Sequence, residues 1–241
     1  MDVAAQRPAR GWLEALPASR LLIEMSLWSA DLGAIAQDMR RVEDGTDIFH
    51  IDVSDGHFTP ALLFFPDLAA RLRQVTARPF HIHLMVADAA LEEQIAQFAE
   101  AGADLITVHA ENANAAAGLE LIRKLGLKAG IALKLETPVA AAASFIARIG
   151  MLTLLGTRLG VKGQSLAAEA PARLREAQAL IAAQAGGRRV VLAADGGIRE
   201  TTVPALRGAG AETVVMGSLA FGAADFAARI AWARNLAKAA L

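Results

Sequence analysis

The chain has 241 residues, a formal net charge of −1 and no cysteine, and 54% of its residues are hydrophobic. A chain of this length and composition can bury one large hydrophobic core. The near-neutral charge argues against a nucleic-acid partner, and the lack of cysteine excludes disulfides and thiolate zinc sites.

The first residues of the chain precede the regular pattern that follows. We interpret residues 1–18 as an N-terminal extension, with one short helix around Trp12, because they contain no apolar core of the signal-peptide kind. No apolar run of the chain approaches the roughly 18 residues that span a bilayer. Together with the absence of cysteine, this predicts a cytoplasmic protein without membrane association.

Eight short runs of β-forming residues recur along the chain, and we predict each as a strand. They span residues 20–27, 48–54, 80–86, 105–111, 129–135, 151–157, 189–196 and 213–220. A helix candidate follows each run, and the clearest of these span residues 32–45, 91–103, 170–185 and 225–241. Strict alternation of this kind predicts parallel strands.

The number of strand–helix units predicts an α/β protein with a single (β/α)8 TIM barrel over residues 19–241. An open, doubly wound sheet is the alternative. The G-x-G-x-x-G pattern that would favour it after the first strand is absent. No linker rich in proline, glycine or serine divides the chain, so we predict one domain.

Polar side chains gather at the predicted carboxyl ends of strands, where barrels hold their active sites. All five histidines fall between residues 50 and 109. His50 and Asp52 are two apart on one strand and share a face, and His83 ends the next strand. Asp195 ends the seventh predicted strand. Two imidazoles with one or two carboxylates suit zinc, iron, manganese or cobalt, although any single histidine could instead be a hydrogen-bonded core residue.

Small residues follow the last two predicted strands. Glycine lets backbone N–H groups approach an anion closely, and barrels often bind phosphate with these two loops. The sequence therefore predicts a phosphate site here, with simple turn glycines as the alternative. The predicted phosphate-binding residues are Gly196, Gly197, Gly217 and Ser218.

The motifs between residues 22 and 222 resemble, in order, those of the ribulose-phosphate 3-epimerase family. "HIDVSDGHFTPA" is similar to the family's H-x-D-V-M-D-G-x-F-V-P-N, and "SLWSAD" to its S-I-L-x-A-D. "HLMV", "HAE", "ADGG" and "GSLAF" match the family's patterns at the third, fourth, seventh and eighth strands.

The resemblance implies a ribulose-phosphate-binding barrel that inverts carbon 3 of a ketose phosphate through an enediolate. The best single substrate is D-ribulose 5-phosphate, converted to D-xylulose 5-phosphate in the pentose phosphate pathway. It implies one divalent metal ion (zinc, iron, manganese or cobalt) on His50, Asp52, His83 and Asp195, with Asp52 and Asp195 as the acid–base pair. Ser26 would contact the substrate near the metal, and the chain would form a homo-oligomer. Met85 would pack over the intermediate as an apolar cover, with a plain core role as the alternative.

The chain also departs from the family pattern around the predicted pocket. Ser54 and Leu155 stand where the family has methionines, and Ala61 replaces an asparagine. Lys134 replaces another asparagine at the fifth strand, while the loop after the sixth strand keeps two glycines and gains two cations. We predict that these residues bind substrate, although the cations could also be solvated: Lys134, Arg158, Gly160, Lys162 and Gly163.

Three other functions remain open at this point. The chemistry could act on another ketose phosphate, such as allulose 6-phosphate or a tetrulose phosphate. The barrel could instead catalyse a metal-free isomerisation of the phosphoribosyl isomerase kind, which the H-x-D and H-L-M patterns disfavour. The chain could also be a non-catalytic sugar-phosphate-binding barrel.

Overall fold

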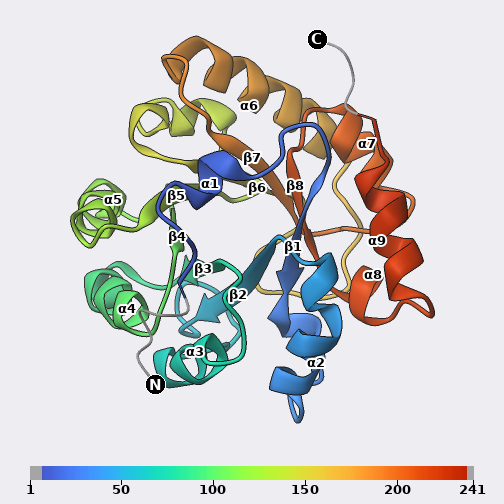
Figure 1. The fold of residues 1–241 in the computed structure, drawn as a ribbon. Helices are drawn as coiled ribbons and strands as arrows, with labels where there is room; N and C mark the ends of the chain where they lie inside the picture. The colour runs from blue at the N-terminus through green and yellow to red at the C-terminus, as the bar shows by residue number, and fades with distance from the viewer. Residues whose placement is uncertain (1–6, 238–241) are drawn as a thin grey trace.

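Parallel strands close into one barrel with helices around it (Figure 1). The computed structural model describes residues 7–237. Each strand pairs with the next along the chain, and the eighth returns to the first. The strands are Leu22–Ser26 (β1), Ile48–Ser54 (β2), Phe80–Met85 (β3), Leu105–His109 (β4), Lys128–Leu133 (β5), Met151–Leu155 (β6), Val191–Asp195 (β7) and Thr213–Met216 (β8). The predicted (β/α)8 TIM barrel is confirmed.

Helices follow most strands and cover the outer surface of the barrel. They are Ile35–Val42 (α2), Pro66–Arg73 (α3), Asp88–Glu100 (α4), Ala115–Lys124 (α5), Ala170–Gln184 (α6), Val203–Gly208 (α7), Ser218–Phe221 (α8) and Phe226–Arg234 (α9). One more helix, Trp12–Ala15 (α1), precedes the first strand. Short 3-10 turns occupy Leu27–Ser29 (η2), Glu43–Gly45 (η3), Val139–Ala142 (η4) and Ile146–Arg148 (η5). Within residues 7–237, no helix has the length and apolar character needed to cross a membrane.

Three details of the predicted elements are wrong. The connection from β5 to β6 forms the turns η4 and η5 in place of an α-helix. The eighth strand ends at Met216, since Gly217 leaves the extended conformation and Ser218 begins α8. The last helix ends at Arg234, and residues 238–241 of the predicted helix lie outside the described part of the chain.

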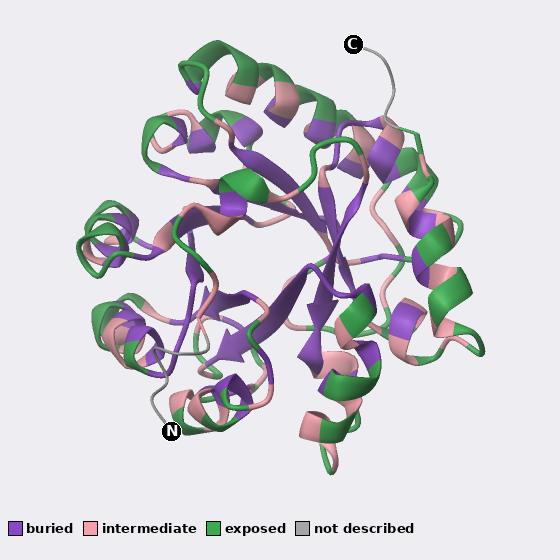
Figure 2. Ribbon diagram, viewed as in Figure 1, coloured by how far each residue is buried: buried purple, intermediate pink, exposed green. Residues whose placement is uncertain are grey.

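The strands are buried on both faces (Figure 2). At the amino ends of the strands, the barrel interior is filled by apolar side chains from several strands, and Leu13 of α1 packs against them. Burying a leucine side chain fully stabilises a fold by roughly 1.5–3 kcal/mol. The helix predicted around Trp12 is confirmed as α1. Through Leu13 it closes the end of the barrel opposite the carboxyl ends of the strands. The domain boundary at residue 18 stays a prediction.

Candidate active site and metal centre

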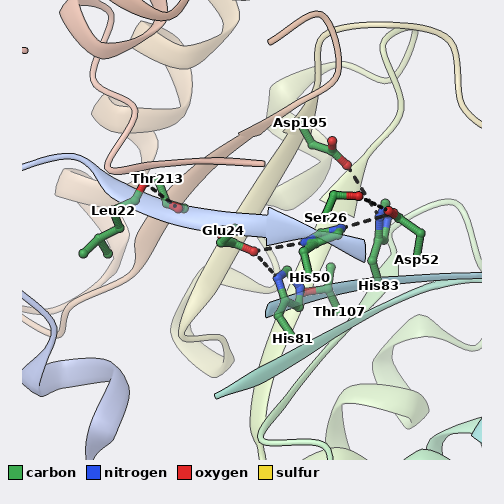
Figure 3. A network of polar contacts seen from close by, with 10 residues as sticks. All are labelled: Leu22, Glu24, Ser26, His50, Asp52, His81, His83, Thr107, Asp195 and Thr213. Carbon is green, nitrogen blue, oxygen red and sulfur yellow. Dashed lines mark hydrogen bonds and ion pairs between the residues drawn. The ribbon is translucent and has the colours of Figure 1, made fainter. Parts of the chain in front are cut away.

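The register of β1, β2 and β3 brings the predicted ligands to one point. Ser26 lies opposite His50, and Asp52 lies opposite His83. Because alternate side chains of a barrel strand point inward, His50, Asp52 and His83 all face the interior. Asp195, at the end of β7, approaches the same point (Figure 3).

The four side chains offer donor atoms that all lie within 4.8 Å of one another. His50 Nε2 lies 3.2 Å from Asp52 Oδ1, and His83 Nδ1 lies 3.3 Å from the same oxygen and 3.7 Å from Asp195 Oδ2. For metal–ligand bonds of about 2.0–2.1 Å, neighbouring donors of a tetrahedron lie roughly 3.3–3.4 Å apart. The donor set therefore fits a single divalent ion.

The two carboxyl groups differ in their electrostatic surroundings. Burial disfavours charge on Asp52, but in the absence of a metal ion, protons on the His50 and His83 nitrogens that face it hold its pKa well below the usual range through attraction and hydrogen bonds. Ser26 Oγ also donates to Asp52 Oδ2 over 3.0 Å. Burial raises the pKa of Asp195 to about 6. The attraction of the histidines lowers this pKa, but repulsion from Asp52 acts in the same direction as burial and offsets that attraction. Neighbouring carboxyl groups of this kind can hold different protonation states.

A hydrogen-bond chain orients His83 from the side opposite the cluster. His83 Nε2 lies 2.9 Å from His109 Nε2, and His109 Nδ1 lies 3.0 Å from Glu111 Oε2. An ionised carboxylate only accepts, so His109 donates from Nδ1 and accepts the Nε2–H of His83. A neutral His83 then presents an unprotonated Nδ1 atom to Asp52 and Asp195. The "HAE" motif thus supplies the orienting pair for one predicted ligand.

Above the cluster, a cavity of about 430 Å³ opens at the carboxyl ends of the strands. Cavities of a few hundred Å³ suit small-molecule ligands. His50 lies beneath this cavity, whereas most of the other predicted site residues line it. These are Ser26, Asp52, His83, Met85, Arg158, Gly160, Lys162, Gly163, Asp195, Gly196, Gly197, Gly217 and Ser218.

Two of the predicted cations make contacts within the protein. Lys162 Nζ donates to the backbone oxygen of Trp28 over 2.5 Å, which joins the loop after β6 to η2 at the cavity. Lys134 does not belong to the described lining; its Nζ lies 3.7 Å from the ring centroid of Phe58. A contact between Lys134 and substrate therefore stays a prediction without support from its position.

Several residues of the site do not stand out in the sequence. Trp28, Ser29, Thr157 and Arg199 also line the cavity. Arg199 could have been suspected, because it directly follows the "DGGI" segment after β7. Glu24 lies in the barrel interior and accepts hydrogen bonds from two histidines. Its only signal in the sequence is a charged residue in an apolar strand, two positions before Ser26.

Comparison with solved structures supports the architecture. A 3-hexulose-6-phosphate synthase is similar in fold, with a TM-score of 0.62 and 20% sequence identity over 88% of this chain and 96% of that chain. An orotidine 5'-phosphate decarboxylase from Pyrococcus horikoshii OT3 has the same TM-score at 14% identity. At these identities the likeness shows the barrel fold alone.

Comparison of sequences is more specific. A ribulose-phosphate 3-epimerase of Bacillus subtilis is 33% identical over 202 residues, covering 83% of this chain and 92% of the relative. Ribulose-phosphate 3-epimerase 1 of Cupriavidus necator is 34% identical over 204 residues, covering 83% and 84%. The model of the ribulose-phosphate 3-epimerase family matches residues 22–221. This chain therefore belongs to the ribulose-phosphate 3-epimerase family.

Proposed function

We propose that this chain is a metal-dependent epimerase that inverts carbon 3 of a ketose phosphate, with D-ribulose 5-phosphate as substrate and D-xylulose 5-phosphate as product. The observation that supports this proposal best is the pair Asp52 and Asp195, which meet at the base of a small-molecule cavity in a chain of this family. Epimerisation next to a ketone requires one group to remove a proton and a second group to return one on the other face.

Asp52 and Asp195 perform these two steps. They reach the cavity from β2 and β7, so a flat intermediate can lie between their carboxyl groups. One carboxyl group must be ionised to accept the proton, and the other must be protonated to donate one. Ser26 holds Asp52 through a hydrogen bond to Oδ2, while Oδ1 lies 3.2 Å from His50 Nε2 and 3.3 Å from His83 Nδ1. The reverse reaction uses the same pair with exchanged roles.

The residues that would hold the divalent ion are His50, Asp52, His83 and Asp195. When bound, the ion supplies positive charge that stabilises the negative charge developing on the substrate oxygens. Two imidazoles and two carboxylates suit zinc, iron, manganese or cobalt alike. Met85 contributes an apolar surface to the cavity near this cluster, and the thioether side chain adapts to a flat ligand.

The phosphate group of the substrate would lie between the loops after β7 and β8. Gly196, Gly197, Gly217 and Ser218 line that part of the cavity, where backbone N–H groups can donate to phosphate oxygens. Arg199 lines the same cavity and adds a cation that the sequence motifs alone did not indicate. Arginine suits bidentate contacts to phosphate.

The cations Arg158, Lys162 and Arg199 in the lining favour a second candidate, the same chemistry on another ketose phosphate. Turnover of ribulose 5-phosphate, allulose 6-phosphate and a tetrulose phosphate by the purified, metal-loaded protein separates the two. We expect the highest kcat/KM for ribulose 5-phosphate. Faster turnover of another sugar would replace the substrate and keep the mechanism, while turnover of none would contradict the proposed function.

Two further features of the protein follow from the family likeness and the composition, and both are proposals. We place the protein in the cytoplasm, in agreement with a chain without cysteine. We also propose that it forms a homo-oligomer. Sedimentation of the purified chain at several concentrations tests the second proposal, and a single species at the mass of one chain would contradict it.

A further inference from the structure

A fully buried carboxylate lies directly beneath the proposed metal centre. Glu24 on β1 has no solvent exposure, and its Oε2 atom lies 3.0 Å from His50 Nδ1 and 2.6 Å from His81 Nδ1 (Figure 3). Its other oxygen, Oε1, is buried without a hydrogen-bond partner among the described residues. A proton on Oε1 would therefore be an unsatisfied buried donor, which favours the form that accepts from both histidines.

The contact with Glu24 determines which nitrogen of His50 carries hydrogen. Because the carboxylate oxygen only accepts, His50 Nδ1 must donate to it, and a neutral His50 is then unprotonated at Nε2. That atom lies 3.2 Å from Asp52 Oδ1. Two acceptors so close together repel each other unless a cation lies between them. The tautomer that Glu24 selects is thus the one that a metal ligand requires.

Glu24 is itself held in place by a second chain of hydrogen bonds. His81 donates from Nδ1 to Glu24 and accepts at Nε2 from the hydroxyl of Thr107 on β4, over 2.7 Å. The rings of His50 and His81 pack edge to face with centroids 4.7 Å apart. The chain from Thr107 through His81 and Glu24 to His50 is fully buried, so none of its first three members touches substrate.

We propose that Glu24 is a positioning residue for the metal centre: through His50 Nδ1 it selects the imidazole tautomer whose Nε2 binds the ion. Thr107 and His81 keep its carboxylate aimed at His50. This inference rests on the proposed function, because it takes His50 as a ligand. Carboxylates that accept from the far nitrogen of a ligating histidine orient the ring and raise its basicity, and removing them commonly weakens metal binding about 10–100-fold.

The test measures zinc affinity of the zinc-free, full-length protein by competition with a chromophoric chelator. We expect Glu24→Ala to weaken the zinc affinity about 10–100-fold. Glu24→Gln should recover part of the zinc affinity, because the amide oxygen can replace Oε2, while its NH₂ group at the place of Oε1 finds no acceptor. Thr213→Ala is the matched control: Thr213 is buried in the barrel and donates to Leu22, away from these histidines.

A second readout does not depend on zinc. Nitrogen chemical shifts of 15N-labelled histidine, recorded at a pH at which His50 is neutral, should show His50 protonated at Nδ1 in zinc-free wild type and in Glu24→Gln, and a mixture of tautomers in Glu24→Ala. If Glu24→Ala does not fold, Thr107→Val removes one hydrogen bond of the chain without changing the side-chain volume. We expect that variant to lose affinity about twofold to tenfold.

Three results would overturn the inference, and they are distinguishable. Unchanged zinc affinity and an unchanged His50 tautomer in Glu24→Ala would show that Glu24 has only a structural role. Two zinc ions per wild-type chain, with one lost in Glu24→Ala, would make Glu24 a ligand itself. A wild-type chain that binds no zinc, iron, manganese or cobalt would overturn the proposed metal centre, and the inference with it.

Discussion

Asp52 and Asp195 are both carboxyl groups at strand ends, yet their surroundings differ. Asp52 accepts a hydrogen bond from Ser26 and lies 3.2 Å from His50 Nε2 and 3.3 Å from His83 Nδ1, while Asp195 lies 3.7 Å from His83 at the other side of the cluster. Such an arrangement lets one group stay ionised beside the other. The difference arises from neighbours supplied by three strands, not from the two residues themselves.

We predict that Asp52→Asn and Asp195→Asn each lower kcat about 10²–10⁴-fold, because asparagine keeps the size of the side chain and cannot exchange the proton. Steady-state epimerisation of ribulose 5-phosphate, with metal content measured in parallel, tests this. Glu120→Gln is the control and should keep full activity, because the half-exposed Glu120 side chain lies on α5 outside the site. Full activity in both aspartate variants would contradict the two-aspartate mechanism.

Glu111 makes the free energy of unfolding depend on pH in the acidic range. Burial opposes its charge, but hydrogen bonds from His109, Thr137 and the Lys134 amide lower its pKa from 4.5 to about 2. A carboxyl group with a lowered pKa stabilises the folded state above its unfolded pKa, and that stability is lost as the pH falls through the folded value. The affected window is therefore pH 4.5 to about 2.

We expect Glu111→Gln to lower the free energy of unfolding by the order of 1–3 kcal/mol above pH 4.5, with the difference shrinking toward pH 2. Urea unfolding at a series of pH values measures it, again with Glu120→Gln as the control. A difference that stays constant across this range would mean that the Glu111 contacts do not depend on its charge.

At the level of single elements, the loop after β6 has no room for a side chain at one of its glycines and has open space at another. Gly160 and Gly163 both have positive φ angles, of 74° and 81°. A Cβ atom at Gly160 would lie 1.8 Å from Thr59 Oγ1, whereas one at Gly163 would have nothing within 4 Å. Both glycines line the cavity, so the comparison isolates the steric contact from the backbone strain.

We predict that Gly160→Ala lowers kcat/KM by about tenfold or more, since the loop must move away from Thr59, at a strain and displacement cost of about 1–2 kcal/mol. Gly163→Ala carries the same backbone strain without the clash and should stay within a few-fold of wild type. The two variants are compared in the same epimerase assay. Equal effects would show that the contact with Thr59 does not position the loop.

For the whole molecule, closure of the barrel turns sequence distance into contact. Ser26 and Ser218 line the same cavity although most of the chain lies between them, because β8 pairs with β1. An ion bound by β2, β3 and β7 at this point would link strands from both halves of the sequence. Its binding energy would therefore add to the stability of the entire barrel.

We predict that a chelator lowers the thermal midpoint by about 5–10 °C. Binding at 100 times Kd contributes about 2.7 kcal/mol, and 1 kcal/mol shifts Tm roughly 2–4 °C in a chain of this size. Differential scanning calorimetry with and without chelator measures the shift. The double variant Asp52→Asn, Asp195→Asn is the control and should not respond. An unchanged Tm in the wild-type protein would contradict a structural contribution of the ion.

Much of this protein could be predicted from local patterns. Each strand overlaps its predicted run. The four predicted ligands, His50, Asp52, His83 and Asp195, do come together. Period-two alternation tells which side chains share a face of a strand, and parallel strands in a barrel end at one edge. Those two rules act within short segments, so they can be read without knowing the remainder of the fold.

Other features depend on contacts between distant segments and could not be predicted. Glu24 meets His50 and His81, and Lys162 reaches Trp28, only because barrel closure and register bring those strands and loops together. The short turns between β5 and β6 and the packing of Leu13 beneath the barrel likewise follow from the space that neighbouring elements leave. Local sequence thus determined the strands and the ligand types, while non-local packing decided which groups orient them.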